Sequence, residues 1–279
     1  KREDELHPMV SGNKFRKLKY TVAEAVSTGK QALLTFGGAY SNHIAAVAAA
    51  GKEMQLPTMG YIRGEELREH YTENPTLAFA ERCGMTLVFI SRQEYREKDS
   101  EAYLAKLKRD YPNAYILPEG GTNALAVRGC SEILTPSDAQ FDYICTPVGT
   151  GGTMAGLVKS AKPSQTVVGY SVLRGTFQSE EIEKYTSNSN YILKDSYCFG
   201  GYAKIDSTLV RFMNTFKAEN GILLDPVYTA KMMYGILNDI NGGFFPKNSR
   251  ILAIHTGGLQ GIAGMNQRIK NKNIPQILT

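Results

Sequence analysis

The chain has 279 residues, of which 42% are hydrophobic and 21% are charged. These are ordinary values for a globular protein, and they argue against a disordered or fibrous chain. Its 32 Lys and Arg against 27 Asp and Glu leave a formal charge of +5, with both signs interspersed. Because no basic stripe interleaved with aromatic residues occurs, nucleic-acid binding is not expected. The length predicts about two domains.

The sequence also carries signals about compartment. No apolar run approaches the roughly 20 residues of a membrane span, and the first residues lack the apolar stretch of a signal peptide. The cysteines are widely spaced without a C-x-x-C pair, which favours reduced core thiols over a disulfide framework or a zinc knuckle. They are Cys83, Cys130, Cys145 and Cys198. We expect a cytoplasmic protein with no membrane partner.

Short apolar stretches of strand length alternate with longer stretches of helical periodicity. In the first half, strands are predicted at 32–36, 58–62, 86–90 and 115–117, and helices at 15–28, 41–53, 75–83 and 95–109. In the second half, strands are predicted at 143–146, 167–171 and 250–254, with a helix at 154–162. This alternation predicts an α/β protein with parallel sheets.

Four of the predicted strands lead into a pair of glycines. The pairs are Gly37-Gly38, Gly120-Gly121, Gly151-Gly152 and Gly257-Gly258. Open parallel sheets bind ligands outside the carboxyl ends of their strands, and glycine there lets the backbone approach a ligand closely. A single pair is explained well enough by a tight turn, but four together predict one shared cleft.

The segment Gly149-Thr150-Gly151-Gly152-Thr153 follows a strand and opens a predicted helix. Unpaired amides at a helix start, together with threonine hydroxyls, suit a phosphate dianion. No Gly-Lys-Ser/Thr of a Walker loop follows, and the third glycine of a dinucleotide fingerprint is absent. The segment therefore predicts a phosphate without a nucleotide. A flexible strand-to-helix turn remains the alternative.

Lys14 follows a Gly12-Asn13 turn at the start of a predicted helix. The neighbouring cations Arg16, Lys17 and Lys19 would disfavour a further positive charge and lower the pKa of the Lys14 amine. A neutral lysine can form a Schiff base with an aldehyde. From these residues alone, however, a solvated basic helix face is the simpler interpretation.

The segment Ser41-Asn42-His43 stands at another predicted helix start. Ser41 is a good capping residue. A Ser–His pair is not expected, because residues two apart on a helix do not face each other and no G-x-S-x-G elbow is present. The four histidines show no metal-ligand spacing, so no metal site is predicted.

Five motifs occur in one order along the chain. They are Gly12-Asn13-Lys14-x-Arg16-Lys17-Leu18, Ser41-Asn42-His43, Gly149-Thr150-Gly151-Gly152-Thr153-x-Ala155-Gly156, Asp225-Pro226-Val227-Tyr228-Thr229 and His255-Thr256-Gly257-Gly258. Together they resemble the pyridoxal-phosphate enzymes comprising D-cysteine desulfhydrase and 1-aminocyclopropane-1-carboxylate (ACC) deaminase, within the tryptophan synthase β-like fold. The resemblance spans nearly the whole chain and favours the reactive-amine interpretation of Lys14.

The resemblance implies pyridoxal 5′-phosphate as the cofactor. Lys14 would hold it as a Schiff base and later shuttle the α-proton of the substrate, and Asn42 would hydrogen-bond the 3-oxygen of the pyridine ring. The glycine-rich segment from Gly149 to Thr153 would hold the phosphate, with Lys17 adding a charge-assisted contact. A homodimer is also implied.

On the substrate side, the resemblance implies that Ser41 holds the carboxylate of a small amino acid or assists proton transfer. Tyr228, and on a weaker match Tyr202, would handle the departing group. Thr229 and Thr256 would lie near the pyridine nitrogen, where ACC deaminases have Glu and Leu. A hydroxyl does not demand a protonated nitrogen as a carboxylate does, and the shallower electron sink suffices to expel a thiolate.

The expected reaction is therefore the α,β-elimination of D-cysteine to pyruvate, sulfide and ammonia. ACC deamination to 2-oxobutyrate and ammonia is the alternative, and a non-catalytic phosphate-ligand-binding protein is a third. Tyr40 and Ile44-Ala45-Ala46 replace residues that are usually polar in desulfhydrases. We expect a small domain at 17–123 and a large domain made of 1–16 and 124–279, with the cofactor in the cleft between them.

Overall fold

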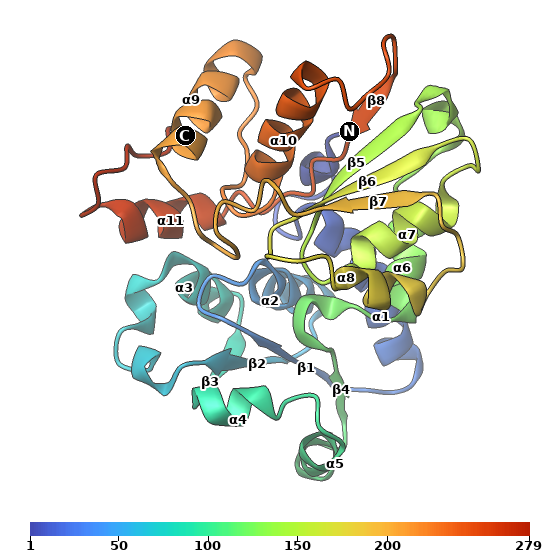
Figure 1. The fold of residues 1–279 in the computed structure, drawn as a ribbon. Coiled ribbons are helices and arrows are strands. Elements are labelled where there is room, and N and C mark those ends of the chain that lie inside the picture. Colours follow the sequence, from blue (N-terminus) through green and yellow to red (C-terminus); the bar gives the residue numbers. More distant parts are fainter.

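The computed structural model describes residues Lys1–Thr279 and contains two separate parallel sheets of four strands each (Figure 1). The first has the order β3-β2-β1-β4, with β1 at Ala32–Gly37, β2 at Thr58–Arg63, β3 at Met85–Ile90 and β4 at Ala114–Ile116. The second has the order β7-β6-β5-β8, with β5 at Tyr143–Val148, β6 at Thr166–Ser171, β7 at Tyr191–Lys194 and β8 at Ile251–Ala253. The predicted α/β fold with two parallel-sheet units is confirmed.

Helices connect the strands and cover both sheets. They are α1 (Asn13–Ser27), α2 (Asn42–Met54), α3 (Pro75–Arg82), α4 (Arg92–Arg96), α5 (Glu101–Asp110), α6 (Ala124–Ser131), α7 (Gly152–Ser160), α8 (Gln178–Glu183), α9 (Ser207–Asn220), α10 (Thr229–Asn241) and α11 (Gly261–Ile269). No helix is at once long enough and apolar enough to cross a membrane.

The central strand of the first sheet is buried on both faces. Leu33 packs with the alanine-rich helix α2 in one core cluster, whereas Leu34 and Phe36 point to the opposite face and pack with Leu107 of α5. This is the environment in which parallel strands become continuous apolar runs, and it explains why β1 is visible in the sequence. The second sheet is built in the same way, with Ile144 facing α7.

One sequence prediction for the secondary structure is wrong, and several elements were not predicted. The single helix expected at 95–109 is two helices, because the Ser100 hydroxyl accepts the Tyr103 amide at 3.3 Å and caps a new helix. The elements that were not predicted are the edge strand β7 and the helices α6, α8, α9, α10 and α11. The four cysteines are free and buried, as predicted.

The carboxyl ends of the two sheets face each other, so that the glycine-rich turns meet. A Cβ placed on Gly120, after β4, would lie 3.0 Å from Cγ2 of Thr150, which follows β5. A Cβ on Gly258, after β8, would lie 2.6 Å from the side-chain nitrogen of Asn42 at the start of α2. The turns after β4 and β5 therefore lie against each other, and the turn after β8 lies against the start of α2.

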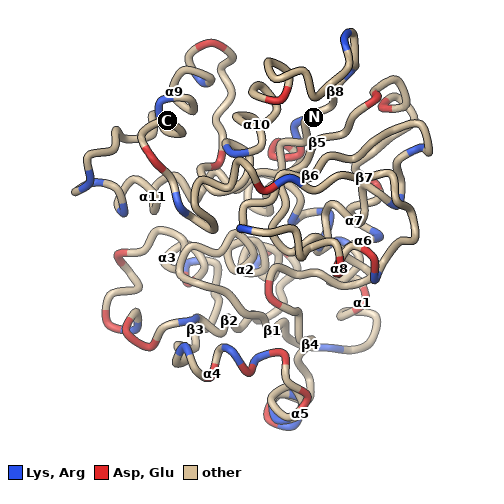
Figure 2. The backbone as a smooth tube through the Cα atoms, viewed as in Figure 1, with Lys and Arg blue, Asp and Glu red and all other residues tan.

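Helix α1 joins the two units. Its side chains Leu18 and Val22 share a core cluster with Leu33 of the first sheet, while the same helix packs closely on α6. The helix is continuous from Asn13 to Ser27, so the expected division after residue 16 falls inside it. Both signs of charge are spread over both units (Figure 2).

Candidate active site

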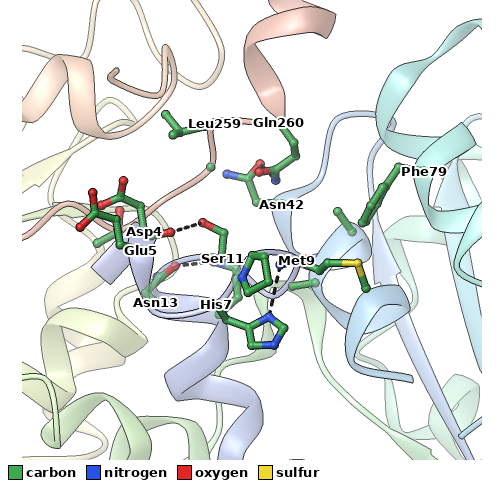
Figure 3. Close-up of a pocket in the computed structure, with 16 residues that line it drawn as sticks. Asp4, Glu5, His7, Met9, Ser11, Asn13, Asn42, Phe79, Leu259 and Gln260 are labelled. Atoms are coloured by element: carbon green, nitrogen blue, oxygen red, sulfur yellow. Dashed lines mark hydrogen bonds between the residues drawn. The ribbon is translucent and has the colours of Figure 1, made fainter. Parts of the chain in front are cut away.

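Lys14 is the second residue of α1 and is partly buried. Gly12, the residue before α1, has φ of 65°, and a Cβ on it would lie 1.9 Å from the Thr256 carbonyl oxygen, so only glycine allows this helix to begin against the loop after β8. Lys14 lines a pocket of about 460 Å³ together with Asn42 and Thr256 (Figure 3). The structure therefore brings these three predicted site residues to one cavity.

The Lys14 amine is perturbed, as the sequence predicts. Burial, and then the nearby Lys17 ammonium, lower the pKa of Lys14 to about 7. The other expected neighbours are paired elsewhere: Arg16 Nε lies 2.8 Å from Glu3 Oε2, and Lys19 Nζ lies 2.6 Å from Glu132 Oε2. Burial is thus the main cause, rather than the cationic cluster expected from the sequence.

The start of α7 offers a row of free backbone donors. Six consecutive amides, from Gly149 to Met154, donate to no other group of the chain. Gly151 has φ of 88°, a left-handed turn that leads directly into the helix at Gly152. Successive amides in such a turn, at the positive end of a helix, form an anion-binding concavity.

Lys17 lies beside this row of amides and is only 2% exposed. Its ammonium donates to the Gly120 carbonyl at 2.8 Å, to Thr122 Oγ1 at 2.9 Å and to Thr150 Oγ1 at 3.5 Å. All three acceptors are uncharged, and burial lowers the pKa of Lys17. The α7 start therefore combines free amides with a buried cation, an arrangement suited to an anion.

Side chains tie the pocket to the α7 start. Asn13, next to Lys14, donates a hydrogen bond from its side-chain Nδ2 to Thr153 Oγ1 at 2.7 Å. On the other side, Gln260 Nε2 donates to Asn42 Oδ1 at 2.7 Å, and the two side chains lie together in Figure 3. The pocket, the glycine-rich turn and the α2 start thus belong to one region.

Ser41 caps α2, since its hydroxyl oxygen accepts the Ile44 amide at 3.2 Å. Ser41 and the glycine-rich turn do not line the pocket of Figure 3. His43 is buried, with Nε2 2.9 Å from Thr35 Oγ1, and its Nδ1 has no partner. Burial lowers the pKa of His43 well below its ordinary value.

Tyr228 and Tyr202 form a pair near the α7 start. A Cβ on Gly149 would lie 3.0 Å from Cε1 of Tyr228, and the two tyrosine rings meet edge to face with centroids 6.2 Å apart. Burial, and then the neighbouring Tyr202, raise the pKa of Tyr228 well above its ordinary value. Tyr202 is 46% exposed, so it forms the outer member of the pair.

Comparison with known proteins shows the family to which the chain belongs. The family described as "Pyridoxal-phosphate dependent enzyme" matches residues 1–257. The chain belongs to this family. The resemblance inferred from the five motifs is therefore confirmed, and the protein is a pyridoxal-phosphate-dependent enzyme.

Similar proteins indicate to which group within this family the chain belongs. The bifunctional D-cysteine desulfhydrase/ACC deaminase of Arabidopsis thaliana, named as mitochondrial, is 33% identical over 94% of this chain and 72% of its own length. The D-cysteine desulfhydrase of Serratia proteamaculans is 26% identical over 96% of this chain and 88% of its own. A crystal structure described as an ACC deaminase homologue is 29% identical, with a TM-score of 0.84, and covers 97% of this chain and 87% of that one. This pyridoxal-phosphate enzyme thus groups with the ACC deaminases and D-cysteine desulfhydrases.

The residues of this enzyme fit the family's cofactor. Pyridoxal phosphate carries a phosphate dianion, which matches the six free amides and the Lys17 ammonium. It also carries an aldehyde, which matches the Lys14 amine, because an amine with a pKa of about 7 is largely neutral above that pH.

The two threonines predicted near the pyridine nitrogen lie in different settings. Thr256 lines the pocket beside Lys14. Thr229 is fully buried at the start of α10, and its hydroxyl oxygen accepts the Asp225 amide at 2.7 Å. The Thr229 hydroxyl therefore already holds the backbone of the Asp225-Tyr228 turn in the enzyme.

The carboxyl of Asp225 was not predicted as a site group, although it lies in one of the five motifs. One oxygen accepts the amides of Val227 at 3.0 Å and Tyr228 at 2.5 Å, and the other would lie 2.9 Å from a Cβ on Gly258. Burial raises the pKa of Asp225 to about 7. Asn13 and Gln260 were missed as well, since their contacts join segments far apart in the chain.

Proposed function

We propose that the enzyme catalyses α,β-elimination from a small amino acid, with D-cysteine as the preferred substrate and pyruvate, sulfide and ammonia as products. The observation that carries the proposal is the Lys14 amine, with its pKa lowered to about 7, at a helix start that is bonded through Asn13 to the anion-binding turn of α7. Thr229 and Thr256, in place of Glu and Leu, favour the desulfhydrase over the deaminase.

The cofactor is held at two points in this proposal. Lys14 Nζ would bind its aldehyde carbon, while the amides from Gly149 to Met154 and the Lys17 ammonium would bind its phosphate. Asn42 would contact the 3-oxygen. When bound, pyridoxal phosphate withdraws electrons from the α-carbon of an attached amino acid and so makes the α-proton removable.

Three side chains would then act on the substrate. Lys14 Nζ, released when the substrate binds, would take the α-proton, because a pKa of about 7 leaves about half of the amine neutral at pH 7 and most of it neutral at higher pH. Ser41 binds the substrate carboxylate. Tyr228 remains protonated at neutral pH, since its pKa is raised, and can donate its hydroxyl proton to the departing sulfur, with Tyr202 beside it.

Closure of the small unit, proposed to span 17–123, over the remainder of the chain would exclude water while the proton is transferred. Because the carbon–sulfur bond breaks by elimination, the enzyme is a lyase. Hydrolysis of the released enamine to pyruvate and ammonia requires no residue of this chain.

ACC deamination is the second candidate. It is favoured by the apolar side chains of Ala45, Ala46 and Phe79, which line the pocket next to Asn42 and suit the methylene groups of a cyclopropane ring. In that reaction Ser41 or Tyr228 would help to open the ring. The same cofactor contacts serve both reactions.

A substrate panel tests the proposal. Purified enzyme with its cofactor is incubated with D-cysteine, L-cysteine, D-serine and ACC, and sulfide, pyruvate and 2-oxobutyrate are measured. Sulfide and pyruvate from D-cysteine support the proposal, whereas 2-oxobutyrate from ACC alone supports the second candidate. No turnover of any amino acid, with the cofactor bound, would make the protein a non-catalytic binder. Lys14→Ala is the matched control and should lose turnover while it remains folded.

Assembly and location belong to the same proposal. We propose a homodimer on the basis of the family resemblance, and a cytoplasmic location on the basis of the four unpaired cysteines. Light scattering coupled to gel filtration measures the mass in solution, and a mass near that of one chain of 30.7 kDa would contradict the dimer.

A further inference from the structure

The loop that carries Tyr202 has an unusual backbone. Phe199, Gly200, Gly201 and Ala203 all have positive φ, at 50°, 86°, 117° and 52°. Two of the four are not glycine, and L-residues occupy this region only when the surrounding structure holds them there. Something must therefore fix the loop from outside.

Lys231 provides that fixed point. It lies on α10, is only 1% exposed, and donates through its ammonium to the carbonyls of Cys198 and Gly201, both at 2.8 Å. The first acceptor immediately precedes the strained residues of the loop, and the second, Gly201, is one of them. Burial lowers the pKa of Lys231 to about 8, so the fold keeps this amine in the interior against a desolvation cost. The two hydrogen bonds to a single loop indicate that the buried ammonium holds this loop in place.

The other tyrosine of the pair adjoins the same helix. Tyr228 is the residue immediately before α10, and Lys231 is the third residue of that helix. The rings of Tyr228 and Tyr202 have centroids 6.2 Å apart. Tyr228 is joined to α10 by the backbone, and the loop that carries Tyr202 is joined to α10 by the hydrogen bonds of the Lys231 ammonium. Because Tyr202 is 46% exposed, its place depends on its backbone more than on side-chain packing.

We propose that Lys231 is a positioning residue that fixes the Cys198–Ala203 loop and thereby places Tyr202 against Tyr228. The inference rests on the proposed function, in which both tyrosines serve the departing group. Lys231 itself does not touch the reacting atoms. Its effect on turnover should therefore pass entirely through Tyr202.

Four variants, among them Lys231→Arg as the conservative one, and the Tyr202→Phe background test this inference on the full chain with its cofactor. Lys231→Met removes the two hydrogen bonds. Gly201→Ala strains the same loop by a different route, because φ is 117° but the space around a Cβ is open. Lys194→Met is the matched control, since it removes another ammonium, which pairs with Asp239 at 2.6 Å. Each is made alone and together with Tyr202→Phe.

We expect Lys231→Met and Gly201→Ala each to lower kcat for D-cysteine by about 10-fold or more, as for a displaced catalytic group, with a smaller change in KM. In the Tyr202→Phe background the same two changes should cost less than about 2-fold, because residues that act as one unit are not additive. Lys231→Arg should recover part of the loss. Lys194→Met should leave kcat unchanged in both backgrounds.

Hydrogen exchange gives a readout independent of turnover. The Gly201 amide donates to the Cys198 carbonyl at 3.0 Å, within the loop. Lys231→Met should speed the exchange of this amide while the amides of α7 are unchanged, and Lys194→Met should do neither. If Lys231→Met fails to fold, Gly201→Ala carries the kinetic test by itself.

The outcomes separate the inference from the proposed function. If Tyr202→Phe slows turnover but Lys231→Met and Gly201→Ala do not, or if their losses multiply with that of Tyr202→Phe, the positioning role is wrong and the proposed function stands. If Tyr202→Phe has no effect on the turnover of D-cysteine, the role of Tyr202 is wrong and the inference falls with it. If D-cysteine is not a substrate, the proposed function fails, whereas loop exchange still reports on the Lys231 anchor.

Discussion

The acidity of Lys14 can be tested directly by changing the pH of the cofactor-free protein. An ordinary lysine, with a pKa of 10.5, is neutral in about one molecule in 1000 at pH 7.5, whereas a pKa of about 7 leaves about three quarters neutral. The expected gain in reactive amine is therefore roughly 700-fold at that pH. This gain is what makes Lys14 suited to bind an aldehyde and to take a proton.

Competitive labelling with acetic anhydride measures this quantity. The enzyme is freed of cofactor and labelled briefly at pH values from 6 to 11, and acetylation of the Lys14 peptide is followed by mass spectrometry against free N-α-acetyl-lysine. We expect the Lys14 rate to rise through a midpoint near pH 7 and then to level off. The reference amine should continue to rise to the highest pH values.

The variant Lys17→Met separates the two causes of the lowered pKa of Lys14. Burial is the larger cause and the Lys17 ammonium the next, so Lys17→Met should move the Lys14 midpoint upward without returning it to the ordinary value. A midpoint above pH 9 in the unmodified protein would refute the argument from burial. A midpoint that is the same with and without Lys17 would refute the contribution of its charge.

Three further predictions concern the surroundings of Lys14. In Gly151→Ala the Cβ has space, 3.5 Å from the Gln178 carbonyl, but an L-residue is forced to φ of 88° at a cost of about 1–2 kcal/mol, so binding of pyridoxal phosphate should weaken roughly 10-fold. Equal weakening of the binding of phosphate-free pyridoxal, measured by absorbance titration, would contradict a phosphate site at this turn. Thr229→Val leaves the buried Asp225 amide without an acceptor and should cost about 1–3 kcal/mol in urea unfolding, while Thr229→Ser should not. Asp225 keeps its proton up to about pH 7 in the folded state but releases it near its ordinary pKa of 3.8 when unfolded, so its contribution to the free energy of unfolding falls as pH rises from about 4 to 7. Asp225→Asn should flatten the dependence of the free energy of unfolding on pH, and an unchanged dependence would exclude the raised pKa of Asp225.

The strands that the sequence predicts are those buried on both faces. In β1 and β5 nearly every residue is buried, so each appears as an apolar run that ends at glycine. The edge strand β7 has no such run, and its Ile192 is 39% exposed, so its four residues resemble a loop. The break between α4 and α5 was missed because the pattern of apolar residues continues across it while the Ser100 cap is a local signal.

The predicted site was recognisable where one short segment carries the chemistry. The Gly149–Thr153 turn is such a segment, since its donors are its own amides. The supporting contacts are of another kind: Asn13 reaches Thr153 across 140 positions and Gln260 reaches Asn42 across 218. No periodicity or local propensity encodes such pairs, because they exist only after the two sheets have come together.

Pairing separates the cations that serve the site from those that only surround it. Arg16 and Lys19, which the sequence placed beside Lys14, are neutralised by Glu3 and Glu132. The buried amine of Lys17, by contrast, has only uncharged acceptors, and so does that of Lys231. A buried cation without a carboxylate costs free energy, so a fold keeps it only where another contact offsets that cost. In our proposal the offset for Lys17 is an anion at the free amides of α7, and the offset for Lys231 is the strained loop that carries Tyr202.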